Sequence, residues 1–192
     1  MKMIFFYILI LLALSNLAFC NTLDMQSDCF SGALTSGFVF KHGDCRFKKV
    51  YGRGMVNVIT GDFCYYTCNF GGIGAKVSYW RASGRTTCFK KCACLQEVPI
   101  TLYLRGLLDL NCCLQLYASL GGGAIWLKEN SYLCKVRKWR GIGEVEIGLN
   151  YPILNCLDFT TAFRYLFPRQ SQDCKKIDVG GCDLRAGFRL SF

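Results

Sequence analysis

The chain ends in Leu184-Arg185-Ala186-Gly187-Phe188-Arg189-Leu190-Ser191-Phe192, and this segment carries the clearest fold signal of the sequence. Its even positions are apolar and its odd positions are charged or small. Such alternation indicates a β-strand with one apolar and one charged face. The strand continues to an aromatic last residue, at a place where the chains of soluble domains usually fray. The stretch therefore predicts a strand of a membrane barrel, with the edge strand of a soluble sheet as the alternative.

The bulk composition is consistent with an exported membrane protein. The 192 residues are enough for a single domain, and 52% of them are hydrophobic. Beyond the N-terminus, however, no uninterrupted apolar run reaches the about 20 residues of a membrane-spanning helix. The fourteen cysteines exceed what a reducing cytosol normally tolerates, so the sequence predicts an oxidising compartment.

Residues 1–20 have the pattern of a cleaved signal peptide. Lys2 provides the basic start, Ile4 to Leu14 form the apolar run, and Ala18-Phe19-Cys20 form the small-x-small cleavage site. The mature domain is then expected to cover residues 21–192. The alternative is a lipoprotein acylated on Cys20, which requires a small residue at the position of Phe19.

The rest of the chain divides into strand-like segments of about the 9–11 residues that a tilted membrane strand needs. They lie at Phe30–Phe40, Val50–Thr60, Phe70–Trp80, Val98–Arg105, Leu114–Trp126, Glu144–Tyr151, Leu157–Phe167 and Leu184–Phe192. From the third segment onward the apolar face carries no charge at its middle, as lipid requires, because Lys or Arg there costs ~2–4 kcal/mol. In the weakly patterned second segment, Val56 and Val58 are expected to form the apolar face. A slip of one residue in that segment would exchange its two faces.

The connections between these segments are alternately short and long. Short ones are expected near Gly61–Cys64, Leu107–Cys112 and Pro152–Cys156, and long ones at Lys41–Lys49, Arg81–Glu97, Lys128–Arg140 and Pro168–Gly180. The predicted fold is all-β: an eight-stranded antiparallel transmembrane β-barrel with both termini in the periplasm and the long loops outside the cell.

Alternation alone does not say which face points inward, because a lipocalin is an eight-stranded barrel with an apolar interior. Small residues on the polar face (Gly121, Gly123, Gly148 and Gly187) suit a crowded interior. Aromatic residues near the strand ends suit interfacial girdles, with Trp126, Trp139, Tyr165 and Phe167 at one rim and Tyr65, Tyr66, Tyr151 and Phe192 at the other. Both features favour an apolar exterior.

The whole mature chain resembles the small eight-stranded outer-membrane proteins of the OmpA-like or OmpW-like transmembrane class. The Phe-terminated strand and Leu120-Gly121-Gly122-Gly123-Ala124 carry this resemblance. The cysteine content resembles that of chlamydial outer-membrane proteins. These resemblances imply a Gram-negative outer-membrane location and a structural role in a disulfide-linked envelope.

Charged residues on the polar face predict an ion cluster inside the barrel. Its expected members are Lys76, Arg105, Glu144, Glu146, Asp158, Arg164, Asp183, Arg185 and Arg189. A hairpin closing near Pro152–Cys156 would place Glu144 opposite Arg164. Eight strands leave room only for side chains, so a structural plug is expected, with a narrow porin-like channel as the alternative.

The cysteines gather near the strand ends, where they are candidates for disulfides. The candidates are Cys29, Cys45, Cys64, Cys68, Cys88, Cys92, Cys94, Cys112, Cys113, Cys134, Cys156, Cys174 and Cys182. Loss of Cys20 would leave thirteen, so at least one thiol would stay free or pair with another envelope protein. Zinc is the competing interpretation of Cys88-x3-Cys92-x-Cys94 and Cys112-Cys113, but the spacing fits no standard site and no metal is predicted.

Basic residues concentrate in the long connections and predict an anion-binding outer surface. The candidates are Arg46, Lys48, Lys49, Lys90, Lys91, Lys135, Arg137, Lys138, Arg140, Lys175 and Lys176. The opposite end is expected to carry acidic residues, Asp24, Asp28, Asp62 and Asp109. The expected partners are outer-membrane lipid and lipopolysaccharide, or a host anionic polysaccharide, whereas nucleic acid is not expected at a cell surface.

The sequence gives little support to a catalytic function. Outer-membrane enzymes that modify lipid A use His with Ser and an acidic residue, and here His42 is the only histidine, with Ser36 and Asp44 as conceivable partners. Their spacing supports no triad, so neither an enzyme nor a cofactor is expected. The sequence predicts a structural envelope protein. The alternatives are an adhesin for anionic polysaccharide, a narrow channel, a lipid-A-modifying enzyme and a soluble cysteine-rich secreted protein.

Overall fold

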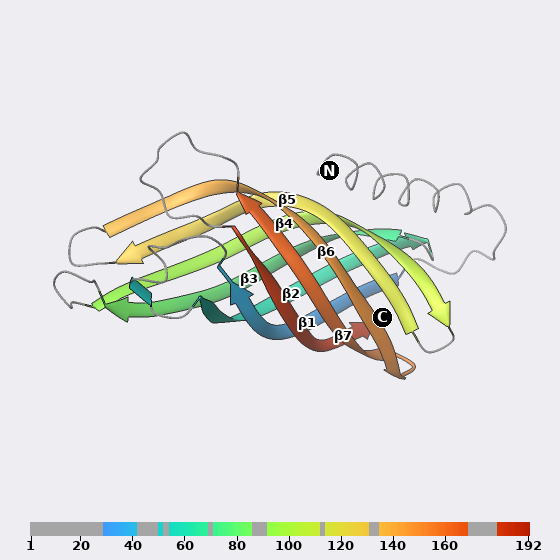
Figure 1. The fold of residues 1–192 in the computed structure, drawn as a ribbon. Helices are drawn as coiled ribbons and strands as arrows, with labels where there is room; N and C mark the ends of the chain where they lie inside the picture. The colour runs from blue at the N-terminus through green and yellow to red at the C-terminus, as the bar shows by residue number, and fades with distance from the viewer. Residues whose placement is uncertain are drawn as a thin grey trace, which may run out of the picture.

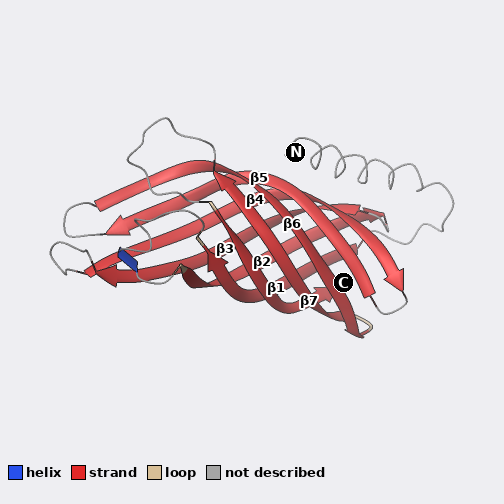
Figure 2. Cartoon of the chain, in the orientation of Figure 1, coloured by secondary structure: helices blue, strands red, loops and turns tan. Residues whose placement is uncertain are grey.

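The protein is a closed antiparallel barrel (Figure 1, Figure 2). The computed structural model describes residues 29–41, 50–51, 54–68, 71–85, 92–111, 114–130, 135–168 and 180–192. Its strands are β1 (Cys29–Phe40), β2 (Met55–Cys68), β3 (Gly71–Arg85), β4 (Cys92–Asn111), β5 (Leu114–Asn130), β6 (Lys135–Leu154), β7 (Leu157–Pro168) and β8 (Gly181–Ser191). Each strand pairs with the next, and β8 closes on β1. The predicted eight-stranded barrel is confirmed. Within the described residues, no helix has the length and apolarity to cross a membrane.

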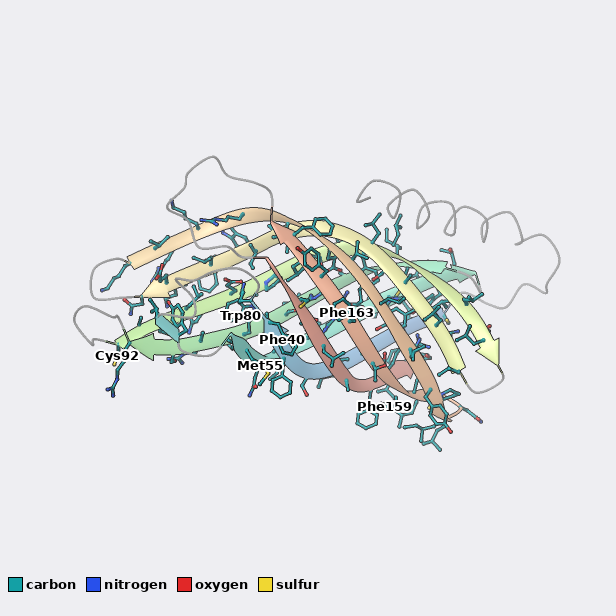
Figure 3. The ribbon with its side chains drawn as sticks, viewed as in Figure 1. Phe40, Met55, Trp80, Cys92, Phe159 and Phe163 are labelled. Atoms are coloured by element: carbon teal, nitrogen blue, oxygen red, sulfur yellow. The ribbon has the colours of Figure 1, made fainter. Side chains whose placement is uncertain are left out.

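The apolar face of nearly every strand points away from the interior. Leu102 and Leu104 of β4 are each 66% exposed, and Phe159 and Phe163 of β7 likewise lie on the outer surface (Figure 3). Between them, Thr101, Tyr103 and other polar residues are buried. A continuous exposed apolar band of this kind needs lipid around it, so the barrel is a transmembrane one. The predicted apolar exterior of β3 to β8 is confirmed, and the lipocalin alternative is wrong.

The prediction for β2 is wrong in both position and face. The strand starts at Met55 and continues to Cys68, so the turn expected near Gly61–Cys64 lies inside it. Val58, expected on the outer face, is 1% exposed, whereas Ile59 and its outward neighbours are exposed. Met55, Ile59 and Phe63 form a longer apolar row than Val56 and Val58 do. A shift of one residue places this longer row against lipid.

The two ends of the barrel differ in shape. At the end that carries the start of β1 and the end of β8, here called the terminus end, only two residues of sequence separate β2 from β3, β4 from β5 and β6 from β7. At the opposite end, the far end, strands β3 to β6 project beyond the others (Figure 1). In the described chain, the pairing of β3 with β2 reaches the far end only as far as Trp80 of β3. The pairing of β6 with β7 likewise reaches only as far as Ile142 of β6. We call residues 81–85, 92–96, 126–130 and 135–141 the extension.

Two stretches that were predicted as loops form strands of the extension instead. The stretch Lys128–Arg140 was expected to be a long connection, but β5 continues to Asn130 and β6 begins at Lys135. The stretch Arg81–Glu97 is likewise mostly strand, paired from Trp80↔Glu97 to Arg85↔Cys92. These segments are polar because they lie beyond the apolar band, and their backbone pairing with each other keeps them extended. Polarity was therefore a poor sign of a loop here.

The seam that closes the barrel depends on two glycines. A Cβ added to Gly37 would lie 1.9 Å from the carbonyl oxygen of Leu184, and one added to Gly187 would lie 2.0 Å from that of Leu34. Real Cβ atoms do not approach backbone this closely. Glycine at these two positions therefore allows β1 and β8 to coil tightly against each other.

Candidate functional site

The middle of the barrel holds a network of buried ion pairs. Lys76 of β3 contacts two carboxylates of β6, with its Nζ 3.0 Å from Glu144 Oε1 and 2.7 Å from Glu146 Oε2. Glu146 also pairs with Arg185 and, at 3.5 Å, with Arg105. All these side chains are nearly inaccessible to solvent. Glu146 is thus the carboxylate on which three cations converge.

Arginines from β7, β8 and β4 complete the network. Arg164 lies 2.6 Å from Asp183, and its other terminal nitrogen lies 3.5 Å from Glu144. Toward the terminus end, Arg189 pairs with Asp158 at 2.7 Å, and Arg105 pairs with Asp62 at 2.5 Å. The basic members are Lys76, Arg105, Arg164, Arg185 and Arg189, and the acidic members are Asp62, Glu144, Glu146, Asp158 and Asp183. The charges of this layer balance.

The structure places all nine sequence-selected interior residues in this layer and adds Asp62, which had been assigned to the acidic end of the barrel. Asp62 stands at an even-numbered position of β2, as do Val58 and Cys64, which are buried. Residues two apart on a strand share a face, and this spacing was the signal that could have identified Asp62. It was missed because the face of β2 was assigned wrongly. Without Asp62 the interior would carry an excess positive charge.

The predicted pairing of Glu144 with Arg164 across the hairpin is wrong by two residues. Glu146 lies opposite Arg164, and Glu144 lies opposite Leu166. The reversal falls at Asn155–Cys156, and an irregularity between Pro152 and Leu154 shifts the register. A shift of two keeps every side chain on its face, so Glu144 still reaches Arg164 diagonally.

An apolar cluster covers the ion layer on the far-end side. It contains Val39, Val58, Trp80, Ala82, Leu95, Ile125, Leu127, Ile142 and Leu166. Lys41 lies against this cluster, with its Nζ 4.4 Å from the Trp80 ring and 3.0 Å from Glu97 Oε2. Lys41 and Glu97 were both assigned to loops by the sequence, and both are buried.

Tyr51 closes the apolar cluster from the far end. Its ring packs on the cluster, and its hydroxyl donates to Glu129 at 3.5 Å. Burial, together with the negative charge of Glu129, raises the pKa of Tyr51 above its usual value. The hydroxyl therefore stays protonated and remains a donor at neutral pH.

A second cluster packs among the ion pairs nearer the terminus end. It contains Cys64, Tyr66, Tyr103, Leu107, Tyr117 and Ala162, with Cys29 packed against it. The Tyr103 hydroxyl donates to Asp62, and the Arg105 guanidinium lies 4.7 Å from the Tyr103 ring and 4.5 Å from the Tyr117 ring. Tyr66 was expected in the outer aromatic girdle, and this prediction is wrong because even-numbered residues of β2 point inward.

The described cysteines are free thiols. Cys29, Cys64, Cys92, Cys94, Cys156 and Cys182 form no disulfide with each other. Cys92, Cys94 and Cys182 lie on strands rather than in loops, and Cys92 stands at the far tip of β4 (Figure 3). Cys45, Cys88, Cys112, Cys113, Cys134 and Cys174 lie outside the described residues, as does the side chain of Cys68. Within the described part, no three His, Cys, Asp or Glu side chains are placed to hold a metal.

Four of the predicted anion-binding residues fall on β6 rather than in a loop: Lys135, Arg137, Lys138 and Arg140. Lys135 and Arg137 share the outward face with Trp139, and Lys138 lies on the other face. The remaining candidates, Arg46, Lys48, Lys49, Lys90, Lys91, Lys175 and Lys176, lie outside the described residues. So do His42 and Asp44, while Ser36 lies exposed on β1.

Comparisons with known proteins agree on the architecture. No protein-family model matches the sequence, and a search of curated proteins found no relative. Among solved structures, Neisserial surface protein A has a TM-score of 0.64 at 12% identity, covering 87% of this chain and 100% of that one. The attachment invasion locus protein Ail of Yersinia pestis, in complex with the heparin analogue sucrose octasulfate, has a TM-score of 0.55 at 15% identity, covering 88% and 100%.

A third structure is the N-terminal β-barrel domain of OprF from Pseudomonas aeruginosa. It has a TM-score of 0.53 at 12% identity, covering 87% of this chain and 98% of that domain. Identities this low establish a shared fold rather than a shared activity. The closed eight-stranded barrel of this chain agrees in fold with these structures. The chain therefore has the fold of the small eight-stranded outer-membrane β-barrels.

Proposed function

We propose that this chain is an integral protein of a bacterial outer membrane, with residues 1–20 as a cleaved signal peptide and 21–192 as the barrel domain. Both termini then lie in the periplasm and the far end lies outside the cell. The two-residue separations between β2 and β3, β4 and β5, and β6 and β7 support this orientation, because periplasmic turns of such barrels are short. The basic residues of the extension support it as well, because the outer leaflet is rich in phosphate.

Its role is structural: it is a closed barrel that stabilises the envelope and does not conduct solutes. The observation that carries this proposal is the packed interior, in which a charge-balanced ion network and two clusters of buried side chains fill the barrel together. An eight-stranded barrel has room only for such side chains. The plug interpretation is therefore preferred over the channel.

Planar bilayers test this closure. We expect the purified barrel, shown to be folded by faster gel mobility before boiling, to insert without producing stepwise currents. The charged side chains inside the barrel are paired with one another, so no water-filled path is available to a passing ion. Stepwise currents whose ion selectivity changes in Glu144→Gln would establish a channel and contradict the proposal.

Exposed cysteines are the proposed attachment points for disulfide-linked envelope proteins. Cys92 at the far end and Cys156 at the terminus end are exposed, whereas Cys64 is buried in the terminus-side cluster. On non-reducing gels of whole envelopes, we expect large assemblies that collapse with reductant. Cys92→Ser or Cys156→Ser should remove a subset of these assemblies, and Cys64→Ser should leave them unchanged. Identical patterns for all three variants and the parent would contradict this role for Cys92 and Cys156.

An adhesin for anionic polysaccharide is the second candidate. It is supported by the basic far end and by the fold shared with Ail, whose structure holds a heparin analogue. Binding of the folded protein to immobilised heparin that disappears at high salt would favour it. Absent or salt-insensitive binding would remove it.

A further inference from the structure

The outward face of the extension is strongly and uniformly basic. It presents Arg81, Arg85, Lys128, Lys135 and Arg137. Two acidic residues, Glu129 in the extension and Glu97 directly beside it, belong to the opposite face, where Glu97 is buried and Glu129 accepts from Tyr51. On the described extension, the outward face therefore carries positive charges without an acidic residue among them.

Three of these cations stand in one row across the sheet. Arg81 lies opposite Gln96, Gln96 opposite Lys128, and Lys128 opposite Arg137. Neighbouring strands are about 4.8 Å apart, so the row spans roughly 14 Å. The Arg81 Nε donates to Cys94 Sγ at 3.1 Å, which holds that guanidinium against the sheet. The row is an array of cationic donors of a size suited to a ligand with more than one anionic group.

A pair of tryptophans lies directly below the row, on the side of the apolar band. Trp126 and Trp139 face each other across β5 and β6, and Trp139 is 61% exposed. They lie two residues from Lys128 and Arg137, which is about 7 Å along the strands. Tryptophan prefers the boundary between lipid tails and headgroups. The cationic row therefore stands at the level of the headgroups.

We propose that this face binds the phosphates of a bisphosphorylated glycolipid, the headgroup chemistry of lipopolysaccharide. This inference rests on the orientation in the proposed function, since it needs the far end in the outer leaflet. Side chains on the outward face of a barrel wall point sideways, toward neighbouring lipid, rather than away from the cell. That direction, and the position just above the tryptophans, favour a membrane lipid over a soluble polysaccharide as the ligand.

The test is a titration of the full-length mature protein, refolded in mild detergent, with bisphosphoryl lipid A and with lipid A stripped of both phosphates. The parent should bind the phosphorylated form several-fold more tightly. Lys128→Gln and Arg137→Gln should each weaken that binding by about fivefold, because one cation near a lipid surface is worth roughly that factor.

Lys138→Gln is the matched control, since it removes the same charge one residue away but on the opposite face. It should change lipid A binding by less than about twofold. An equal loss in Lys138→Gln and Arg137→Gln would overturn the inference, because binding would then follow total charge. Heparin binding that depends on Arg137, without any preference for phosphorylated lipid A, would also overturn it and assign the face to a polysaccharide.

Orientation is measured separately, by reaction of Cys92 with a membrane-impermeant thiol reagent on intact cells after mild reduction, with Cys92→Ser as the background. Labelling is expected. Labelling together with no preference for phosphorylated lipid A would overturn the inference alone. A preference for phosphorylated lipid A without labelling would contradict the orientation in the proposed function, and with it the outer leaflet as the source of the ligand.

Discussion

Replacing Glu146 with Gln is expected to lower the free energy of unfolding by about 3–5 kcal/mol, the range found when one partner of a buried ion pair is removed. Lys76, Arg105 and Arg185 all converge on this carboxylate. The amide keeps the shape of the side chain but leaves an excess positive charge in a layer that solvent does not reach. No neighbouring carboxylate can compensate for it without abandoning its own partner.

Reversible unfolding of the barrel in lipid vesicles with guanidinium, followed by tryptophan fluorescence, measures this loss. Asp109→Asn is the matched control: its carboxylate is exposed and accepts a hydrogen bond from Gln115, so its loss should cost less than about 1 kcal/mol. The double variant Lys76→Met with Glu146→Gln restores the charge balance and should be more stable than Glu146→Gln alone. A double variant that loses as much as both single losses added would mean that the balance of the layer is unimportant.

Replacing Trp80 with Ala is expected to destabilise the barrel by about 3–5 kcal/mol, the usual cost of truncating a buried aromatic residue. Trp80 is 1% exposed, and it is the largest fully buried side chain of the far-end cluster. Its removal would also uncover Lys41, whose ammonium lies over the ring while paired to Glu97. The far-end side of the ion layer would then open toward solvent.

Trp139→Ala is the matched control for Trp80→Ala, because it deletes the same side chain from an exposed position on the outer face. Guanidinium unfolding in vesicles should show a loss of at most about 1 kcal/mol for Trp139→Ala. Equal losses for both variants would contradict the assignment of Trp80 to a packed plug. Lipid A binding should respond in the opposite way, being weakened more by Trp139→Ala than by Trp80→Ala.

The sequence determined which residues face lipid wherever alternation was long and strict. In β8 every even-numbered residue from Leu184 to Leu190 is apolar and exposed, and in β6 Glu144 and Glu146 had to point inward because their neighbours Val145 and Ile147 are apolar. A period of two needs no knowledge of the neighbouring strands. Fold class, strand number and nine members of the ion layer could therefore be derived from local pattern.

The register and the length of the strands could be seen only in the folded barrel, because both depend on contacts between strands. The face of β2 was settled by pairing with β1 and β3, which moved Val58 and Asp62 inside. The partner of Arg164 was set by the place where the hairpin turns. The extension and the Lys41–Glu97 pair were hidden because a polar strand beyond the lipid band has the composition of a loop. Backbone pairing with a neighbour, rather than side-chain polarity, makes it a strand.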